Sequence, residues 1–143
     1  MSDQNTTYVK RWFNEVWNAK KPEVVHELLA EKAVMHGITH TGADVTGPEE
    51  FLKLYSELVT AFPDIRFQIH ECFGSGDHVC IRWTASMRHT GPGLGMTPTN
   101  APVHLSGIGI ARVENGKAVE TWDSWDRQAM YQQLEAATKA TSA

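Results

Sequence analysis

The chain has 143 residues, a formal net charge of −4 and an ordinary share of hydrophobic residues, 41%, which suits one soluble domain with a sizeable core. Its Lys and Arg residues are scattered, no apolar run approaches the roughly 20 residues of a membrane span, and the first thirty residues do not resemble a secretory signal. We therefore expect no nucleic-acid partner, no membrane attachment and a cytoplasmic location.

The first half of the chain predicts three helices. Apolar residues at helical spacing indicate a first helix over residues 7–18, and Pro22 suits the first turn of a short second helix. Residues 33–40 form a strand-like segment. In Thr46-Gly47-Pro48-Glu49, Thr46 and Glu49 fit a capping box, which starts a third helix that Pro63 ends.

After Pro63 the pattern alternates, as in strands. Strands are expected from Ile65, over 79–89, over 103–113 and over 117–126, the last two joined by an Asn-Gly turn. The Gly/Pro-rich residues 90–102 would form a loop at the cavity mouth, and a final helix would run from 127 to 139 before a disordered tail, 139–143. These elements predict a single α+β domain over 1–143, in which a curved antiparallel sheet forms a cone closed by the N-terminal helices. Such a concavity suits a small molecule.

Residues 121–126, Thr-Trp-Asp-Ser-Trp-Asp, are the most informative stretch. A carboxylate beside aromatic surface in a cavity loses solvation, which raises its pKa and suits it to general acid/base chemistry. Packing and helix capping explain the same pattern equally well. The alternation places Asp123 and Trp125 on the inner face and Trp122 on the other, while Asp126 would cap the final helix.

The chain resembles the SnoaL-like polyketide cyclases, of the superfamily that shares the nuclear transport factor fold. The stretches that carry the resemblance are Phe13-Asn14-Glu15-Val16-Trp17-Asn18, Thr46-Gly47-Pro48-Glu49, Ala61-Phe62-Pro63-Asp64, Arg82-Trp83-Thr84, His89-Thr90-Gly91, Met96-Thr97-Pro98-Thr99, Asn115-Gly116-Lys117 and Trp122-Asp123. They cover nearly the whole chain in order. The resemblance implies the cone-shaped fold and a homodimer formed through the sheet, but the fold hosts many activities.

In the family's aldol cyclases an aspartate on the last strand is the acid/base, and the resemblance assigns that role to Asp123. A pocket histidine of the family falls on Gly109 here, with Gly107 on the same face; both would widen the cavity. A pocket asparagine corresponds to His36, and a tyrosine to Trp17. No cofactor or metal is implied.

Two histidines have competing interpretations. His36 would face Asp123 as a second proton carrier, or would be a surface histidine. His89 would polarise a substrate carbonyl, or would tie the following loop to the sheet. His36 and His40 have the spacing HxxxH, but they lie in an extended segment rather than on a helix and have no matched third ligand, so no metal is expected. The residues expected to line the substrate pocket, each of which also suits plain core, are Trp17, Phe51, Leu54, Leu58, His89, Met96, Leu105, Gly107, Gly109 and Trp125.

The leading hypothesis is therefore a small-molecule enzyme in which Asp123 drives enolisation with aldol ring closure, or a related isomerisation or hydration, of an apolar, polyketide-like substrate. An epoxide hydrolase is a rival, but it needs an arginine between two inward carboxylates. A non-catalytic binding module is the second hypothesis. The third is an assembly role, for which Ser106, Ile108 and Ile110 suit the sheet's outer face.

Overall fold

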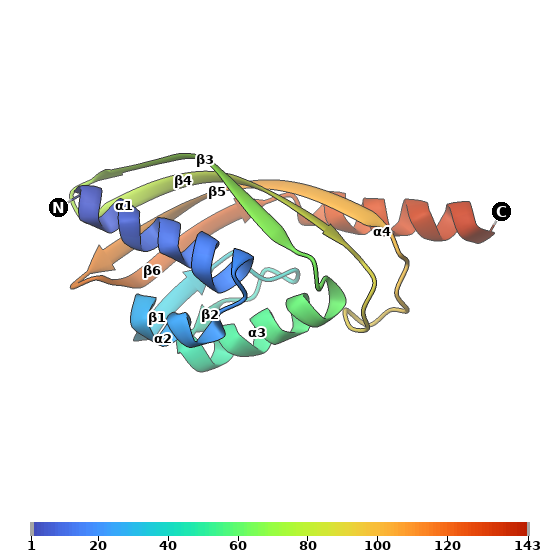
Figure 1. Ribbon diagram of the computed structural model, residues 1–143, viewed down its shortest axis with the longest axis horizontal. Helices are drawn as coiled ribbons and strands as arrows, with labels where there is room; N and C mark the ends of the chain where they lie inside the picture. Colours follow the sequence, from blue (N-terminus) through green and yellow to red (C-terminus); the bar gives the residue numbers. More distant parts are fainter. Residues whose placement is uncertain (1, 143) are drawn as a thin grey trace.

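The computed structural model describes residues 2–142, and the side chains of 4–137. A curved six-stranded sheet with the order β2-β1-β6-β5-β4-β3 forms a half-open cone, and the N-terminal helices lie across its concave side (Figure 1). The strands are β1 (Leu29–His36), β2 (Val45–Thr46), β3 (Arg66–Ser75), β4 (His78–Arg88), β5 (Pro102–Glu114) and β6 (Lys117–Trp125).

The α+β cone predicted from the sequence is confirmed. Strands β3 to β6 form the expected antiparallel meander. The sheet is mixed, however, because β1 pairs in parallel with β6, with Met35 opposite Thr121 and His36 opposite Trp122. This pairing brings the N-terminal strand beside the stretch that carries Asp123.

The first helix is longer than predicted and changes its winding. Helix α1 (Ser2–Arg11) continues directly into a π-helical segment, η1 (Trp12–Asn18). Segments of π-helix are rare and often lie at functional sites. Here the segment holds the indoles of Trp12 and Trp17 over the concave face of the sheet, where both line a cavity.

The other helices follow the predicted order. They are the 3-10 turn η2 (Pro22–Val24), α2 (Val25–Leu28), α3 (Gly47–Ala61) and α4 (Arg127–Ser142). Helix α4 extends past the edge of the sheet (Figure 1). The tail expected to be disordered is thus helical through Ser142, and residue 143 lies outside the described residues. None of the helices in the described chain is long and apolar enough to traverse a membrane.

The capping box predicted for α3 is wrong in detail. The Thr46 side chain makes no cap bond, and the Thr46 N–H donates to Glu50 Oε1 (3.0 Å) rather than to Glu49. Gly47 has a φ of +78°, outside the helical region, so the regular turn starts one residue later than the sequence suggests. Glu50 therefore takes the position expected for Glu49.

The core lies between the concave face of the sheet and the helices. On β4 the alternating residues Val79, Ile81, Trp83, Ala85 and Met87 are all buried, as the sequence pattern predicts. The neighbouring side chains point to the convex, outer face. There Arg82 forms an ion pair with Glu71, with Nε 2.7 Å from Oε1.

Candidate active site

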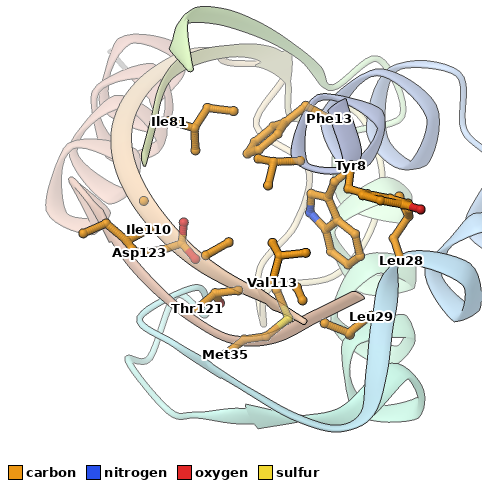
Figure 2. A pocket seen from close by; sticks show the side chains of 15 residues that line it. Tyr8, Phe13, Leu28, Leu29, Met35, Ile81, Ile110, Val113, Thr121 and Asp123 are labelled. Carbon is orange, nitrogen blue, oxygen red and sulfur yellow. The ribbon is translucent and has the colours of Figure 1, made fainter. Parts of the chain in front are cut away.

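The concave side of the sheet encloses an apolar cavity with two lobes, which share Trp12, Phe13, Met35 and Asp123. The first lobe, shown in Figure 2, is completed by Tyr8, Val9, Leu28, Leu29, Ile81, Gly109, Ile110, Ala111, Val113, Ala118 and Thr121. The second lobe is completed by Trp17, Ile38, His40, Phe51, Leu54, Leu58, Phe62, Ile65, Phe67, Trp83, Ala85, Met87, Leu105, Trp125 and Met130.

The cone is therefore not filled by its own core. The centre of a water-sized sphere can occupy about 60 Å³ in the first lobe and about 110 Å³ in the second. On this measure one water needs roughly 10–15 Å³, so each lobe has room for several waters. The space suits a compact ligand and is smaller than the several hundred cubic ångströms that drug-sized ligands occupy.

Asp123 lies where the two lobes meet. Its carboxylate points from β6 into the cavity (Figure 2). The residue is half-buried, and the protein atoms around its carboxyl group remove much of the solvation of that group. This burial disfavours the charged form and raises the pKa of Asp123 to about 7. The nearby Thr121 hydroxyl lowers the pKa slightly, although it forms no hydrogen bond of normal geometry.

Gly109 makes room for this carboxylate. Gly109 and Asp123 are paired across β5 and β6, in a register that a bulge between Arg112 and Val113 shifts by one residue from that of the Asn-Gly turn. A Cβ at position 109 would clash with Asp123 Oδ1. The glycine that replaces the family's pocket histidine therefore lets the acid lie flat against β5, in addition to lining the first lobe.

Gly107 does not widen the cavity as expected, because an indole covers it. It faces Trp83 in the register of β4 and β5. A Cβ at position 107 would clash with Trp83 Cζ2 and would lie 2.7 Å from Cε2. The Trp83 ring thus packs directly on Gly107. Trp83 lines the second lobe, and Gly107 does not.

His36 does not face Asp123. Its Nδ1 lies 3.1 Å from Asp44 Oδ1 and its Nε2 lies 2.8 Å from Glu120 Oε2, and its ring stacks on Trp122. Glu120 and Trp122 alternate with Thr121 and Asp123 along β6, so His36 is on the outer face. Hydrogen bonds to Glu120 and Asp44 raise the pKa of His36. The role of second proton carrier beside Asp123 is therefore not available to it.

His89 ties the following loop to the sheet. The residue is fully buried, its Nδ1 accepts a hydrogen bond from the Thr99 N–H (3.2 Å), and its backbone N–H donates to the Ala101 carbonyl (2.9 Å). Burial lowers the pKa of His89. Neither His89 nor Met96 lines a lobe, so the predicted substrate contacts of these two residues are absent.

The other predicted pocket residues do line the cavity. Those in the second lobe are Trp17, Phe51, Leu54, Leu58, Leu105 and Trp125. The Trp125 Nε1–H donates to the Gly37 carbonyl at 3.0 Å. Asp126 caps α4 as predicted, because its Oδ1 accepts from the Ala129 N–H (2.9 Å).

His40 is a cavity residue that the sequence interpretation missed, because it considered His40 only as a metal ligand. His40 lines both the second lobe and a hollow on the surface. Its Nδ1 lies 2.8 Å from the Tyr131 hydroxyl, and its Nε2 lies 3.6 Å from Glu57 Oε1. Across the described side chains, no three His, Cys, Asp or Glu residues converge as metal ligands do.

This arrangement can perform proton chemistry on an apolar molecule. A carboxyl group with a pKa near 7 exists in both forms near neutral pH, so it can accept a proton and return it. The walls of both lobes are mostly apolar, which suits an apolar ligand. Neither lobe has an arginine among its described lining residues, so the arginine between two carboxylates that an epoxide hydrolase needs is not present.

Comparisons with known proteins agree with this architecture. A candidate SnoaL-like polyketide cyclase from Jannaschia sp. CCS1 superposes with a TM-score of 0.85 at 22% identity, covering 95% of this chain and 94% of that one. IdmH, a candidate polyketide cyclase from Streptomyces antibioticus, gives 0.78 at 27% identity, with 92% and 99% covered.

An LEH-like epoxide hydrolase from M. tuberculosis shares the fold alone, with a TM-score of 0.75 at 16% identity over 99% of this chain and 96% of that one. No curated protein matches. The family model of the SnoaL-like polyketide cyclases matches residues 7–134. Because that match spans most of the sequence, the chain belongs to the SnoaL-like polyketide cyclase family.

Proposed function

We propose that the chain is a cofactor-independent enzyme in which Asp123 is the general acid/base for enolisation of an apolar carbonyl compound, followed by aldol ring closure or a related isomerisation or hydration. The observation that carries the proposal is the position of the Asp123 carboxyl group, at the junction of two apolar lobes with a pKa raised to about 7. The family of the chain points to the same chemistry.

The steps balance without a further reagent. The Asp123 carboxylate removes a proton from the carbon next to a carbonyl, and the electrons of that C–H bond move onto the carbonyl oxygen as an enolate. The enolate carbon then attacks a second carbonyl of the same molecule, which forms the C–C bond and an alkoxide. The protonated Asp123 returns its proton to the alkoxide, so the enzyme ends in its starting state.

Enolisation can be tested before the natural substrate is known. In D₂O an enolising enzyme exchanges the α-protons of a ketone for deuterium, which NMR follows directly, starting with cyclohexanone and other compact apolar ketones. We expect wild-type protein to accelerate this exchange and Asp123→Asn to lose about 10²-fold or more of the acceleration, the usual contribution of a general base. An unchanged rate in Asp123→Asn would refute the role of Asp123.

A non-catalytic binding module is the alternative, and the small size of the cavity suits it equally well. It predicts that apolar ketones bind to wild-type protein without any exchange above the uncatalysed rate. In that case Asp123→Asn would change only the affinity. The epoxide hydrolase hypothesis is weaker, since no arginine lies among the described residues around Asp123.

We also propose that two copies associate through the outer face of the sheet. Phe73, Cys80, Ile110 and Trp122 are paired in turn across β3 to β6, and Phe73, Ile110 and Trp122 are exposed. Ile110 also borders the first lobe, but 41% of its surface is exposed. Ile108 lies two residues before Ile110 on the same face of β5 and is 51% exposed. Such contiguous apolar surface is typical of interaction sites. Sedimentation should show a dimer that Ile108→Glu dissociates; a wild-type monomer would contradict the proposal.

The cytoplasmic location stays a prediction.

A further inference from the structure

Trp83, which lines the second lobe, carries a hydrogen-bond donor that the protein itself does not use. Three buried side-chain polar atoms of the described residues lack a partner: Trp83 Nε1, Thr121 Oγ1 and His89 Nε2. Trp83 and Thr121 line the cavity, in the second and the first lobe respectively. A buried donor without an acceptor destabilises the folded state, and native proteins leave few of them.

Trp83 cannot turn this donor toward bulk solvent. The residue is 7% exposed, and its ring packs at a steep angle against Phe67, with a centroid distance of 5.1 Å. On the other side it rests on Gly107. The ring atoms Cζ2 and Cε2 lie close over Gly107, so the indole is held between Phe67 and β5.

The same strand supports Asp123. The Trp83 indole packs on Gly107, and the Asp123 carboxylate packs on Gly109. The two glycines are two residues apart on the inner face of β5. Trp83 Nε1 makes no hydrogen bond to Asp123, so the N–H is not used to hold the acid. The Trp83 ring and the Asp123 carboxylate therefore pack on glycines two residues apart on β5, and both residues line the second lobe.

We propose that the Trp83 indole N–H binds the carbonyl oxygen of the ligand in the second lobe, beside the carbon from which Asp123 removes a proton. This inference rests on the proposed function and narrows its ligands to apolar compounds that carry an oxygen acceptor. An indole N–H can only donate, which suits a carbonyl oxygen and suits the negative enolate oxygen better. Trp83 would thus donate to the ligand a hydrogen bond that Gly109, which has no side chain, cannot provide.

Two probes of equal shape test the hydrogen bond. Cyclohexanone has an acceptor oxygen where methylenecyclohexane has a CH₂ group. The ratio of their affinities should fall about fivefold in Trp83→Phe, because the variant keeps the aromatic bulk and loses the donor, and one hydrogen bond contributes a factor of this size. An unchanged ratio would overturn the proposal.

The indole resonances of wild-type protein give a second measurement, which stands even if Trp83→Phe does not fold. The five tryptophans each give one ¹H–¹⁵N indole signal. The Trp83 signal should move downfield with cyclohexanone and not with methylenecyclohexane. Trp125 is the internal control, because its N–H is already bonded to Gly37. An equal response of Trp83 to both probes would contradict the proposal.

These experiments distinguish a failure of the Trp83 hydrogen bond from a failure of the proposed enzymatic function. If cyclohexanone shifts the Trp83 signal but its α-protons do not exchange, the chain binds carbonyl compounds through Trp83 and the enzymatic proposal fails alone. If exchange occurs and Trp83→Phe leaves both the rate and the affinity ratio unchanged, the role of Trp83 fails alone. If neither probe binds to wild-type protein, both fail.

Discussion

The Asp123 carboxylate occupies the space in which a β-carbon of residue 109 would lie. The two residues face each other across β5 and β6, so the conformation of the acid depends on the absence of a side chain on the neighbouring strand. The glycine at this position and the acid therefore form one structural unit.

This unit predicts strong coupling between the two positions. Gly109→Ala should destabilise the fold by about 1–3 kcal/mol, the usual cost of overpacking, and should displace the carboxylate and slow α-proton exchange. In the background of Asp123→Ala the clashing oxygen is absent, so the same Gly109→Ala change should cost clearly less. Urea unfolding of the four proteins of this cycle measures the coupling. Equal costs in both backgrounds would show that the carboxylate does not rest on Gly109.

The raised pKa of Asp123 predicts a specific dependence of stability on pH. The folded-state pKa of about 7 exceeds the reference value of 3.8, so between these values the folded protein binds more protons than the unfolded chain. The free energy of unfolding should therefore fall as pH rises from about 4 to about 7, and stay lower above that. Because this loss comes from ionising a buried group, Asp123→Asn should not show it.

The comparison of wild-type protein with Asp123→Asn isolates that contribution. A shift of about three pKa units corresponds to on the order of 4 kcal/mol, so the variant should be the more stable protein at pH 8 by up to this amount. At pH 4 the two should be similar. Urea unfolding at both pH values measures the difference. A pH-independent difference would mean that Asp123 titrates near its ordinary pKa.

Thr121 provides a finer adjustment of the same group. Its hydroxyl lies on the inner face of β6 and lowers the pKa of Asp123, against the larger effect of burial. Thr121→Val keeps the shape and removes the hydroxyl, so the pKa of Asp123 should rise further above about 7. Thr121→Ser keeps the hydroxyl and is the matched control. The ¹³C shift of the Asp123 carboxyl group during a pH titration reports both values, and a lower pKa in Thr121→Val would contradict the assignment.

The sequence was sufficient for those features that depend on local alternation. The inward position of Asp123 and the capping role of Asp126 follow from the alternation along β6 and from the start of α4, and both could be predicted. The two-residue turn Asn115-Gly116 alone would pair Gly109 with Trp122. A bulge between Arg112 and Val113 shifts the register by one residue, so Gly109 pairs with Asp123, as the resemblance to the family implied. A change of one residue in that register would have turned Asp123 outward.

Features that depend on distant segments could not be predicted in this way. His36 lies on the outer face because β1 pairs in parallel with β6, and no local pattern specifies the register of such a long connection. Gly107 was expected to open the cavity, but whether a glycine leaves a gap depends on the side chain across the sheet, here Trp83. The π-helical winding of η1 likewise leaves no simple trace in the apolar spacing.

His40 predicts how ligands enter the second lobe. His40 and Leu54 line both this lobe and the surface hollow formed with Thr39, Glu50 and Glu57, and the Tyr131 hydroxyl lies 2.8 Å from His40 Nδ1. His40→Ala should join the two spaces, so cyclohexanone should dissociate several-fold faster, as measured by NMR exchange broadening. Tyr131→Phe releases the imidazole but keeps its bulk, so its effect should be smaller and in the same direction. If His40→Ala leaves the dissociation rate unchanged, ligands enter by another route, and the first lobe beside Tyr8 and Leu28 is then the entrance to test.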